Sequence, residues 1–171
     1  MNLRFIYPFE VSWQDYPSRE DSAIVVYLPG CNHGCKGCHN PELQDYNQGI
    51  DEDINIFYAV LERESKRNRT LKIVFEGGDP LFSKNIEGIK EFLKINAEKN
   101  KFEICIYTGY SIEFVMEQKV TGFTYIKCGK FEQSLFCQPG KTEEKMVFAS
   151  SNQKLYNAKY KVVSKNNEFF F

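Results

Sequence analysis

The sequence predicts an α/β fold with a mostly parallel sheet, in the form of a partial (β/α) barrel. Short apolar segments alternate with amphipathic ones, and glycine-containing turns follow three of the four clearest strands. Such alternation implies right-handed βαβ units. The chain has 171 residues, whereas a full (β/α)₈ barrel takes roughly 250. We therefore expect one domain, residues 1–171, that is shorter than a TIM barrel.

The first half of the chain contains two strand–helix units. Residues 23–28 form a continuous apolar run rich in β-branched side chains, which is typical of a strand buried in a parallel sheet. Residues 51–66 predict a helix, because the apolar side chains share one face, acids come first and basic residues last. Residues 71–75 predict the second strand and residues 85–100 the second helix.

The second half repeats this pattern once more and then becomes irregular. Residues 102–107 predict a third strand, and residues 111–118 a short helix that begins with a serine, a favoured N-cap. Residues 123–127 predict a fourth strand. Further on, residues 129–145 resemble a loop and residues 159–164 a late strand.

Composition excludes several classes of partner. The 22 basic and 23 acidic residues give a net charge of −1, so nothing draws the chain as a whole to nucleic acid or anionic lipid. The N-terminus lacks the apolar core of a signal peptide, and the longest apolar run is far short of the about 20 residues that span a membrane. We expect a cytoplasmic protein without nucleic-acid or membrane partners.

Three of the six cysteines lie within eight residues, directly after the first strand. Cys31, Cys35 and Cys38 have the spacing C-x₃-C-x₂-C. Iron–sulfur clusters are normally held by four thiolates. Three thiolates on a four-iron cluster leave one iron open, and an open position distinguishes a reactive site from a structural one. Gly34 and Gly37 allow the backbone to curl around such a cluster.

Other uses of these cysteines stay open at this stage. Zinc held by the three thiolates with His33 or His39 is one, although structural zinc sites usually draw on two separated ligand pairs. Free thiols are another.

The remaining cysteines carry weaker signals. Cys105 lies within an apolar strand, where a free thiol packs as a small hydrophobe. Cys128 and Cys137 flank the predicted loop without the C-x₂-C spacing that would favour a second cluster. The sequence assigns no role to the phenylalanine-rich tail, residues 168–171.

The cysteine motif resembles the signature of the radical S-adenosylmethionine superfamily. The finer pattern Cys31-x-His33-x-Cys35-x-Gly37-Cys38-x-Asn40-Pro41 resembles one branch, the activating proteins of anaerobic ribonucleoside-triphosphate reductases. The similarity extends over roughly residues 20–160. Four further motifs match that branch in order: Gly77-Gly78-Asp79-Pro80-Leu81, Tyr107-Thr108-Gly109-Tyr110, Gly129-x-Phe131 and Ser150-Ser151-Asn152-Gln153.

The resemblance implies two cofactors. Cys31, Cys35 and Cys38 would hold a [4Fe-4S] cluster, and S-adenosyl-L-methionine would bind beside it. The amino group would meet the backbone and acid of the glycine motif, and the adenine would lie near His39. The cofactor-binding residues implied in this way are Gly37, Cys38, His39, Gly77, Gly78, Asp79, Tyr107 and Thr108. By residue chemistry alone, Gly-Gly-Asp-Pro is also an ordinary turn.

The resemblance also implies a radical reaction. The reduced cluster would cleave S-adenosylmethionine to methionine and a 5′-deoxyadenosyl radical, which would take a hydrogen from a glycine of the large reductase subunit. A one-electron donor such as a flavodoxin would supply the electron. Because 171 residues are few for enclosing a radical, a docked protein substrate would complete the enclosure. The alternatives are a radical enzyme for a small molecule, of the nucleoside-base synthase type, and a non-catalytic zinc-binding module.

Several positions depart from the branch pattern. Glu76 stands before the glycine pair, where relatives often have a small or hydroxyl residue. Cys128 stands where an aspartate is common, and Phe148-Ala149 where an Arg-Gly pair is common. Residues 11–22 differ from the short glycine-rich opening of the branch. We expect these differences to affect the partner-facing surface rather than the cluster.

Overall fold

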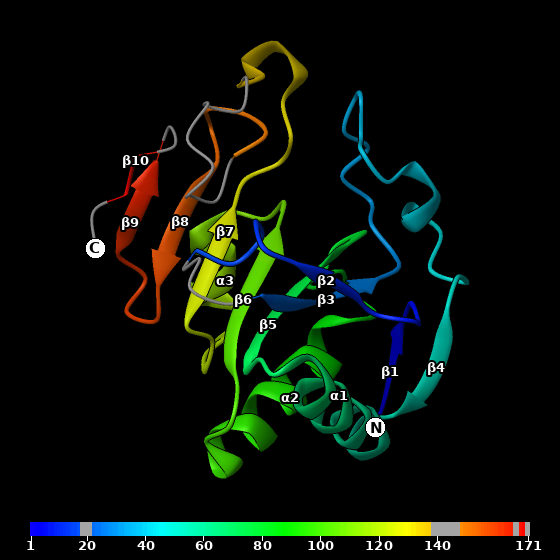
Figure 1. Ribbon diagram of the computed structural model, residues 1–171. Helices are drawn as coiled ribbons and strands as arrows, with labels where there is room; N and C mark the ends of the chain where they lie inside the picture. The colour runs from blue at the N-terminus through cyan, green and yellow to red at the C-terminus, as the bar shows by residue number, and fades with distance from the viewer. Residues whose placement is uncertain (18–21, 138–147, 166–167, 170–171) are drawn as a thin grey trace.

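The computed structural model describes residues 1–17, 22–137, 148–165 and 168–169. Its main sheet has four parallel strands at the centre, and three helices connect them along the chain (Figure 1). The central strands, in sheet order, are β7 (Tyr125–Cys128), β6 (Glu103–Thr108), β5 (Lys72–Gly77) and β3 (Ala23–Leu28). The helices are α1 (Ile54–Asn68), α2 (Ile86–Lys99) and α3 (Ile112–Glu117).

Short antiparallel strands extend the sheet on both sides. β2 (Glu10–Ser12) pairs with β3 at one edge. β8 (Lys154–Asn157), β9 (Val162–Lys165) and β10 (Glu168–Phe169) follow β7 at the other edge. The mixed α/β fold is confirmed, and the parallel pairing holds for the four central strands.

A separate two-stranded sheet corrects one prediction. β1 (Asn2–Phe5) pairs with β4 (Ile50–Asp53), so the helix predicted from residue 51 begins only at Ile54. The acids that resembled the first turn of a helix belong to β4. The last of them, Asp53, is the N-cap, and its carboxylate accepts the backbone N–H of Asn55 at 2.9 Å.

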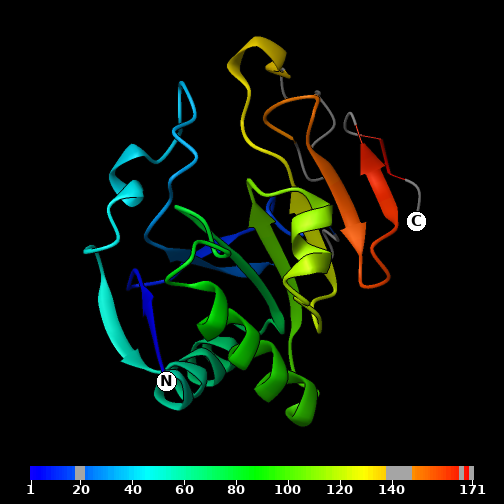
Figure 2. The ribbon, with the colours of Figure 1, turned by 180° about the vertical axis from the view of Figure 1, so that it is seen from behind.

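The two faces of the main sheet are covered differently. Figures 1 and 2 show all three helices on one face. Beneath them lies the larger core, where Phe57, Phe75 and Phe92 pack ring against ring. The opposite face carries a smaller core around Val74, Cys105 and other buried residues.

The loops that follow the central strands leave the same edge of the sheet, because parallel strands end together. In Figure 1 the long segments after β3 and β7 rise from this edge on opposite sides. Across the part of the chain that the structure describes, no helix is both long and apolar enough to cross a bilayer.

Candidate metal centre

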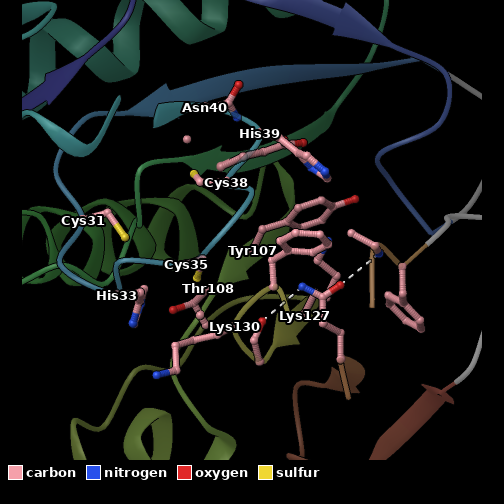
Figure 3. A pocket seen from close by; sticks show the side chains of 18 of the residues that line it. Cys31, His33, Cys35, Cys38, His39, Asn40, Tyr107, Thr108, Lys127 and Lys130 are labelled. Atoms are coloured by element: carbon pink, nitrogen blue, oxygen red, sulfur yellow. Dashed lines mark hydrogen bonds between the residues drawn. The ribbon is translucent and has the colours of Figure 1, made fainter. Parts of the chain in front are cut away.

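A cleft of about 410 Å³ opens at the carboxyl edge of the central strands (Figure 3). It brings together residues from the loop after β3, the ends of β5 and β6, and the segment after β7. Cys31, Cys35 and Cys38 all line it. So do six of the eight predicted cofactor residues: Cys38, His39, Gly77, Gly78, Tyr107 and Thr108. Gly37, which is exposed, and Asp79, which is buried, are not among the lining residues.

The three cysteines are free thiols, partly buried in the cleft wall. Their loop turns tightly, since the Cys38 N–H donates to the Cys35 carbonyl at 3.2 Å. Gly37 adopts a φ of +74°, a conformation that side-chain-bearing residues rarely take. Burial raises the pKa of the Cys31 thiol to about 11, and Asp79 acts in the same direction. Binding a metal at Cys31 therefore requires displacement of a proton.

The arrangement of the thiols fits a cluster better than a single ion. Among the described residues, no three Cys, His, Asp or Glu side chains converge closely enough to hold one metal ion. Zinc needs its ligands gathered around one atom, with Zn–S bonds of about 2.3 Å. A four-iron cluster binds each thiolate to a different iron, so its ligands lie farther apart. All three cysteines line the cleft.

Asp79 lies under the cysteine loop and is only 2% exposed. Its Oδ1 accepts the backbone N–H of Leu81 at 2.8 Å, and its Oδ2 accepts that of Gly109 at 2.8 Å. The Thr108 hydroxyl donates to the same carboxylate at 2.8 Å. Nε2 of His33 lies 2.6 Å from Oδ2, where a ring N–H can donate. The carboxylate expected at a cofactor ammonium is thus already surrounded by donors from this chain.

His33 occupies a socket that the sequence motif did not reveal. Its ring packs edge-on against Tyr110, with 4.5 Å between centroids, and Tyr110 stacks on Phe114 of α3 at 4.0 Å. A Cβ atom at Gly109 would lie only 2.6 Å from the His33 ring. His33 therefore joins the cysteine loop to the ends of β5 and β6 through Asp79. Among the described residues, His33 forms no group with the cysteines that could hold a single metal ion.

The backbone around Gly78 is interlocked with the base of the cysteine loop. The Gly78 N–H donates to the Leu28 carbonyl at 2.9 Å, and the Asp79 N–H to the Gly30 carbonyl at 2.8 Å. A Cβ atom at Gly78 would lie 2.4 Å from the Leu43 carbonyl oxygen and 2.6 Å from that of Gly30. These are backbone atoms, so the glycine turn and the base of the cysteine loop would have to move apart.

We expect Gly78→Ala to destabilise the fold by about 3 kcal/mol, because overpacking against backbone cannot be relieved by a side-chain rotation. The measurement is the free energy of unfolding in urea. Gly34→Ala is the matched control: its φ is +63° but nothing lies within 4 Å, so it should cost only about 1–2 kcal/mol of backbone strain. Equal losses in the two variants would contradict the interlock.

The segment after β7 forms the other wall. His39 packs on Phe131 with 4.8 Å between ring centroids. Gln153 links the two ends of this segment. Its Oε1 accepts the Ala149 N–H at 3.0 Å, and its Nε2 donates to the Gly129 carbonyl at 3.1 Å. The two C-terminal sequence motifs thus meet in space.

The scattered cysteines behave mostly as expected. Cys105 is fully buried, as predicted, and Cys128 is 4% exposed. Cys137 lies at the cleft. Residues 138–147 of the predicted loop and 170–171 of the tail lie outside the described residues. Glu76, Lys127 and Phe136 line the cleft without having been predicted.

Comparison with known proteins identifies the family. A family model described as a 4Fe-4S single cluster domain matches residues 20–156, well over half of the chain. The chain belongs to this family. As a 4Fe-4S single cluster domain, it has the iron–sulfur character that the three-cysteine loop predicted.

The chain is similar to several proteins named anaerobic ribonucleoside-triphosphate reductase-activating protein. The one from Haemophilus influenzae is 27% identical over 138 residues, which cover 78% of this chain and 86% of that protein. The one from Enterobacteria phage T4 is 28% identical over 159 residues, which cover 92% and 94%. The one from Escherichia coli K12 is 26% identical over 145 residues, which cover 79% and 88%. The resemblance stated from the motifs is thereby confirmed.

Proposed function

We propose that this 4Fe-4S domain is a radical S-adenosylmethionine activase. With its cluster and S-adenosylmethionine bound, it would supply one-electron cleavage of the sulfonium, giving methionine and a 5′-deoxyadenosyl radical that takes a hydrogen from a glycine of anaerobic ribonucleotide reductase. One observation carries the proposal: the three cysteines line the same cleft as the glycine turn after β5 and the end of β6. The names of the similar proteins support the reductase as partner.

The chain's own residues would bind and orient the cofactors. Cys31, Cys35 and Cys38 would hold the cluster and leave one iron open toward the cleft. The proposed cofactor contacts remain Gly37, Cys38, His39, Gly77, Gly78, Asp79, Tyr107 and Thr108. Because its carboxylate already binds His33 and Thr108, Asp79 would act first by fixing the cysteine loop. The backbone of Gly77 and Gly78, which lines the cleft, would meet the amino group of the cofactor.

The surroundings of the site support a protein substrate. The cleft is open, so a docked protein would complete the exclusion of water from the radical. We propose that residues 1–171 act as one radical S-adenosylmethionine domain, with the sheet as a partial (β/α) barrel, in the cytoplasm. A one-electron donor such as a flavodoxin would reduce the cluster, and nucleic acid and membrane would not take part.

The decisive experiment is anaerobic incubation with the reductase, S-adenosylmethionine and a chemical reductant. We expect a glycyl-radical signal in electron paramagnetic resonance, absent with Cys35→Ala. Metal analysis of the anaerobic protein should give about four irons and four sulfides per chain. One zinc without iron, or full turnover of a small substrate with no partner protein, would contradict the proposal.

A further inference from the structure

An acidic and a basic side chain line the cleft from the face of the sheet that is opposite the helices. Glu76 of β5, Tyr107 of β6 and Lys127 of β7 lie side by side on three neighbouring strands. Tyr107 is paired with Lys127 in the register of β6 and β7. Phe75 is paired with Ile106 in the register of β5 and β6, so the residues that follow them, Glu76 and Tyr107, are also neighbours. All three line the cleft (Figure 3 labels Tyr107 and Lys127). We call Glu76 and Lys127 the floor pair.

The tyrosine between them is held in place. The Tyr107 hydroxyl donates to the backbone carbonyl of Asp15, and the Lys127 ammonium lies 3.8 Å from the centre of the Tyr107 ring. Such a contact between a cation and an aromatic face is favourable when it is shielded from water. The position of the Lys127 ammonium is thus fixed by the ring beneath it.

One carboxylate oxygen of Glu76 lacks a hydrogen-bond partner. Its Oε1 atom is buried and has no hydrogen-bond partner in the described part of the chain. Burial raises the pKa of Glu76 to about 8; Asp15 and Glu10 act in the same direction, and Lys127 opposes them. Burial also lowers the pKa of Lys127, against the charge of Glu76. An unpaired buried oxygen is costly, so a ligand that brought a donor to it would bind favourably.

We propose that the floor pair binds the main chain of the glycine segment in the protein substrate. This inference rests on the proposed function and specifies how the substrate is recognised. A glycine has no side chain, so a site that selects one must read its N–H donor and its C=O acceptor. Glu76 supplies the acceptor for the N–H, and Lys127 supplies the donor for the C=O.

The competing occupant is the ribose of the cofactor, whose hydroxyl groups also suit an acid and a base. The rest of the cleft favours the peptide. The cysteine loop and the His39–Phe131 pair, which would hold the two ends of the cofactor, belong to the loops above the strands. Glu76 and Lys127 belong to neither of these loops: they lie on β5 and β7, line the cleft and are absent from the proposed cofactor contacts. The substrate glycine must enter that space to meet the reacting carbon.

The test uses two peptides and the anaerobically reconstituted protein. One peptide spans the radical-bearing glycine of the reductase. The other is the same peptide with an ester oxygen in place of the glycine N–H, which keeps the shape and removes the donor. The peptides are compared at about pH 9, above the Glu76 pKa of about 8, so that its carboxylate is charged. Because a hydrogen bond to a charged group contributes about 1.5–3 kcal/mol, we expect the ester to bind at least tenfold more weakly. Equal binding of the two peptides would overturn the proposal without any variant being made.

Variants then assign the effect to the floor pair. Glu76→Leu should bind both peptides equally weakly, and Lys127→Met should weaken both peptides by a similar factor. S-adenosylmethionine binding, measured with radiolabelled cofactor, should change less than twofold in each. The double variant Glu76→Leu/Lys127→Met keeps the test usable if one unpaired charge prevents folding, since replacing both members of a buried pair is often neutral.

A matched pair on the helical side serves as control. Lys101 and Glu62 form an ion pair at 3.2 Å, and neither lines the cleft. Glu62→Leu and Lys101→Met should leave the tenfold discrimination intact. Weakened cofactor binding with unchanged peptide discrimination in the floor variants would instead assign the pair to the ribose. Whichever ligand the floor pair binds, the glycyl-radical signal of the wild-type protein tests the proposed function independently of these binding measurements.

Discussion

Alanine in place of Cys31, Cys35 or Cys38 is expected to reduce bound iron from about four atoms per chain to a trace and to abolish the proposed activity. The three thiols are the only cysteines in the loop after β3. His33 in the same loop lies with its Nε2 2.6 Å from the Asp79 carboxylate. Iron and sulfide analysis with visible absorption spectra provides the measurement.

Cys105→Ala is the matched control for this prediction. Its thiol is fully buried in β6 and packs in the smaller core. The variant should keep its iron while losing about 1 kcal/mol of stability to the small cavity. If a loop variant retained as much iron as Cys105→Ala, the three-thiolate site would be refuted.

Asp79→Ala is expected to lower the free energy of unfolding by about 3–5 kcal/mol, as in the breaking of a buried charged network. The change leaves the Thr108 hydroxyl, the His33 ring and two backbone N–H groups without their shared acceptor. Denaturant unfolding of the protein without metal measures this loss apart from cluster binding. Iron uptake should fall as well, because His33 no longer fixes the cysteine loop.

Asp45→Ala tests whether the effect is specific to the buried carboxylate. Asp45 accepts the Asn47 N–H at 2.9 Å in an exposed turn, so its loss should cost less than about 1 kcal/mol. A loss at Asp79 no larger than the loss at Asp45 would show that the buried network contributes little.

The sequence predicted the centre of the fold better than its edges. Strands such as Ala23–Leu28 are continuous apolar runs, and this pattern alone indicates burial in a parallel sheet. β1, β2 and β8 have three or four residues each, and their pairing depends on neighbours distant in sequence. The acids of β4 carried a misleading signal, since a helix start and an exposed edge strand both favour them.

The candidate site was also predictable only in part. The motifs predicted which residues would gather at one edge of the sheet. They could not predict that His33 meets Asp79, because 46 residues separate the two and the contact exists only in the folded chain. Glu76 was recognised as a departure from relatives, but its connection with Lys127 required the register of three strands.

The contacts of Gln153 have a consequence for how the protein can vary. By holding Ala149 and Gly129 together, Gln153 closes the base of the chain between them. The segment between them carries Phe131 and Phe136, which line the cleft. Substitutions at these two positions can therefore alter the shape of the cleft while Gln153 keeps both ends of the segment in place and the three-cysteine loop on the other wall retains its geometry.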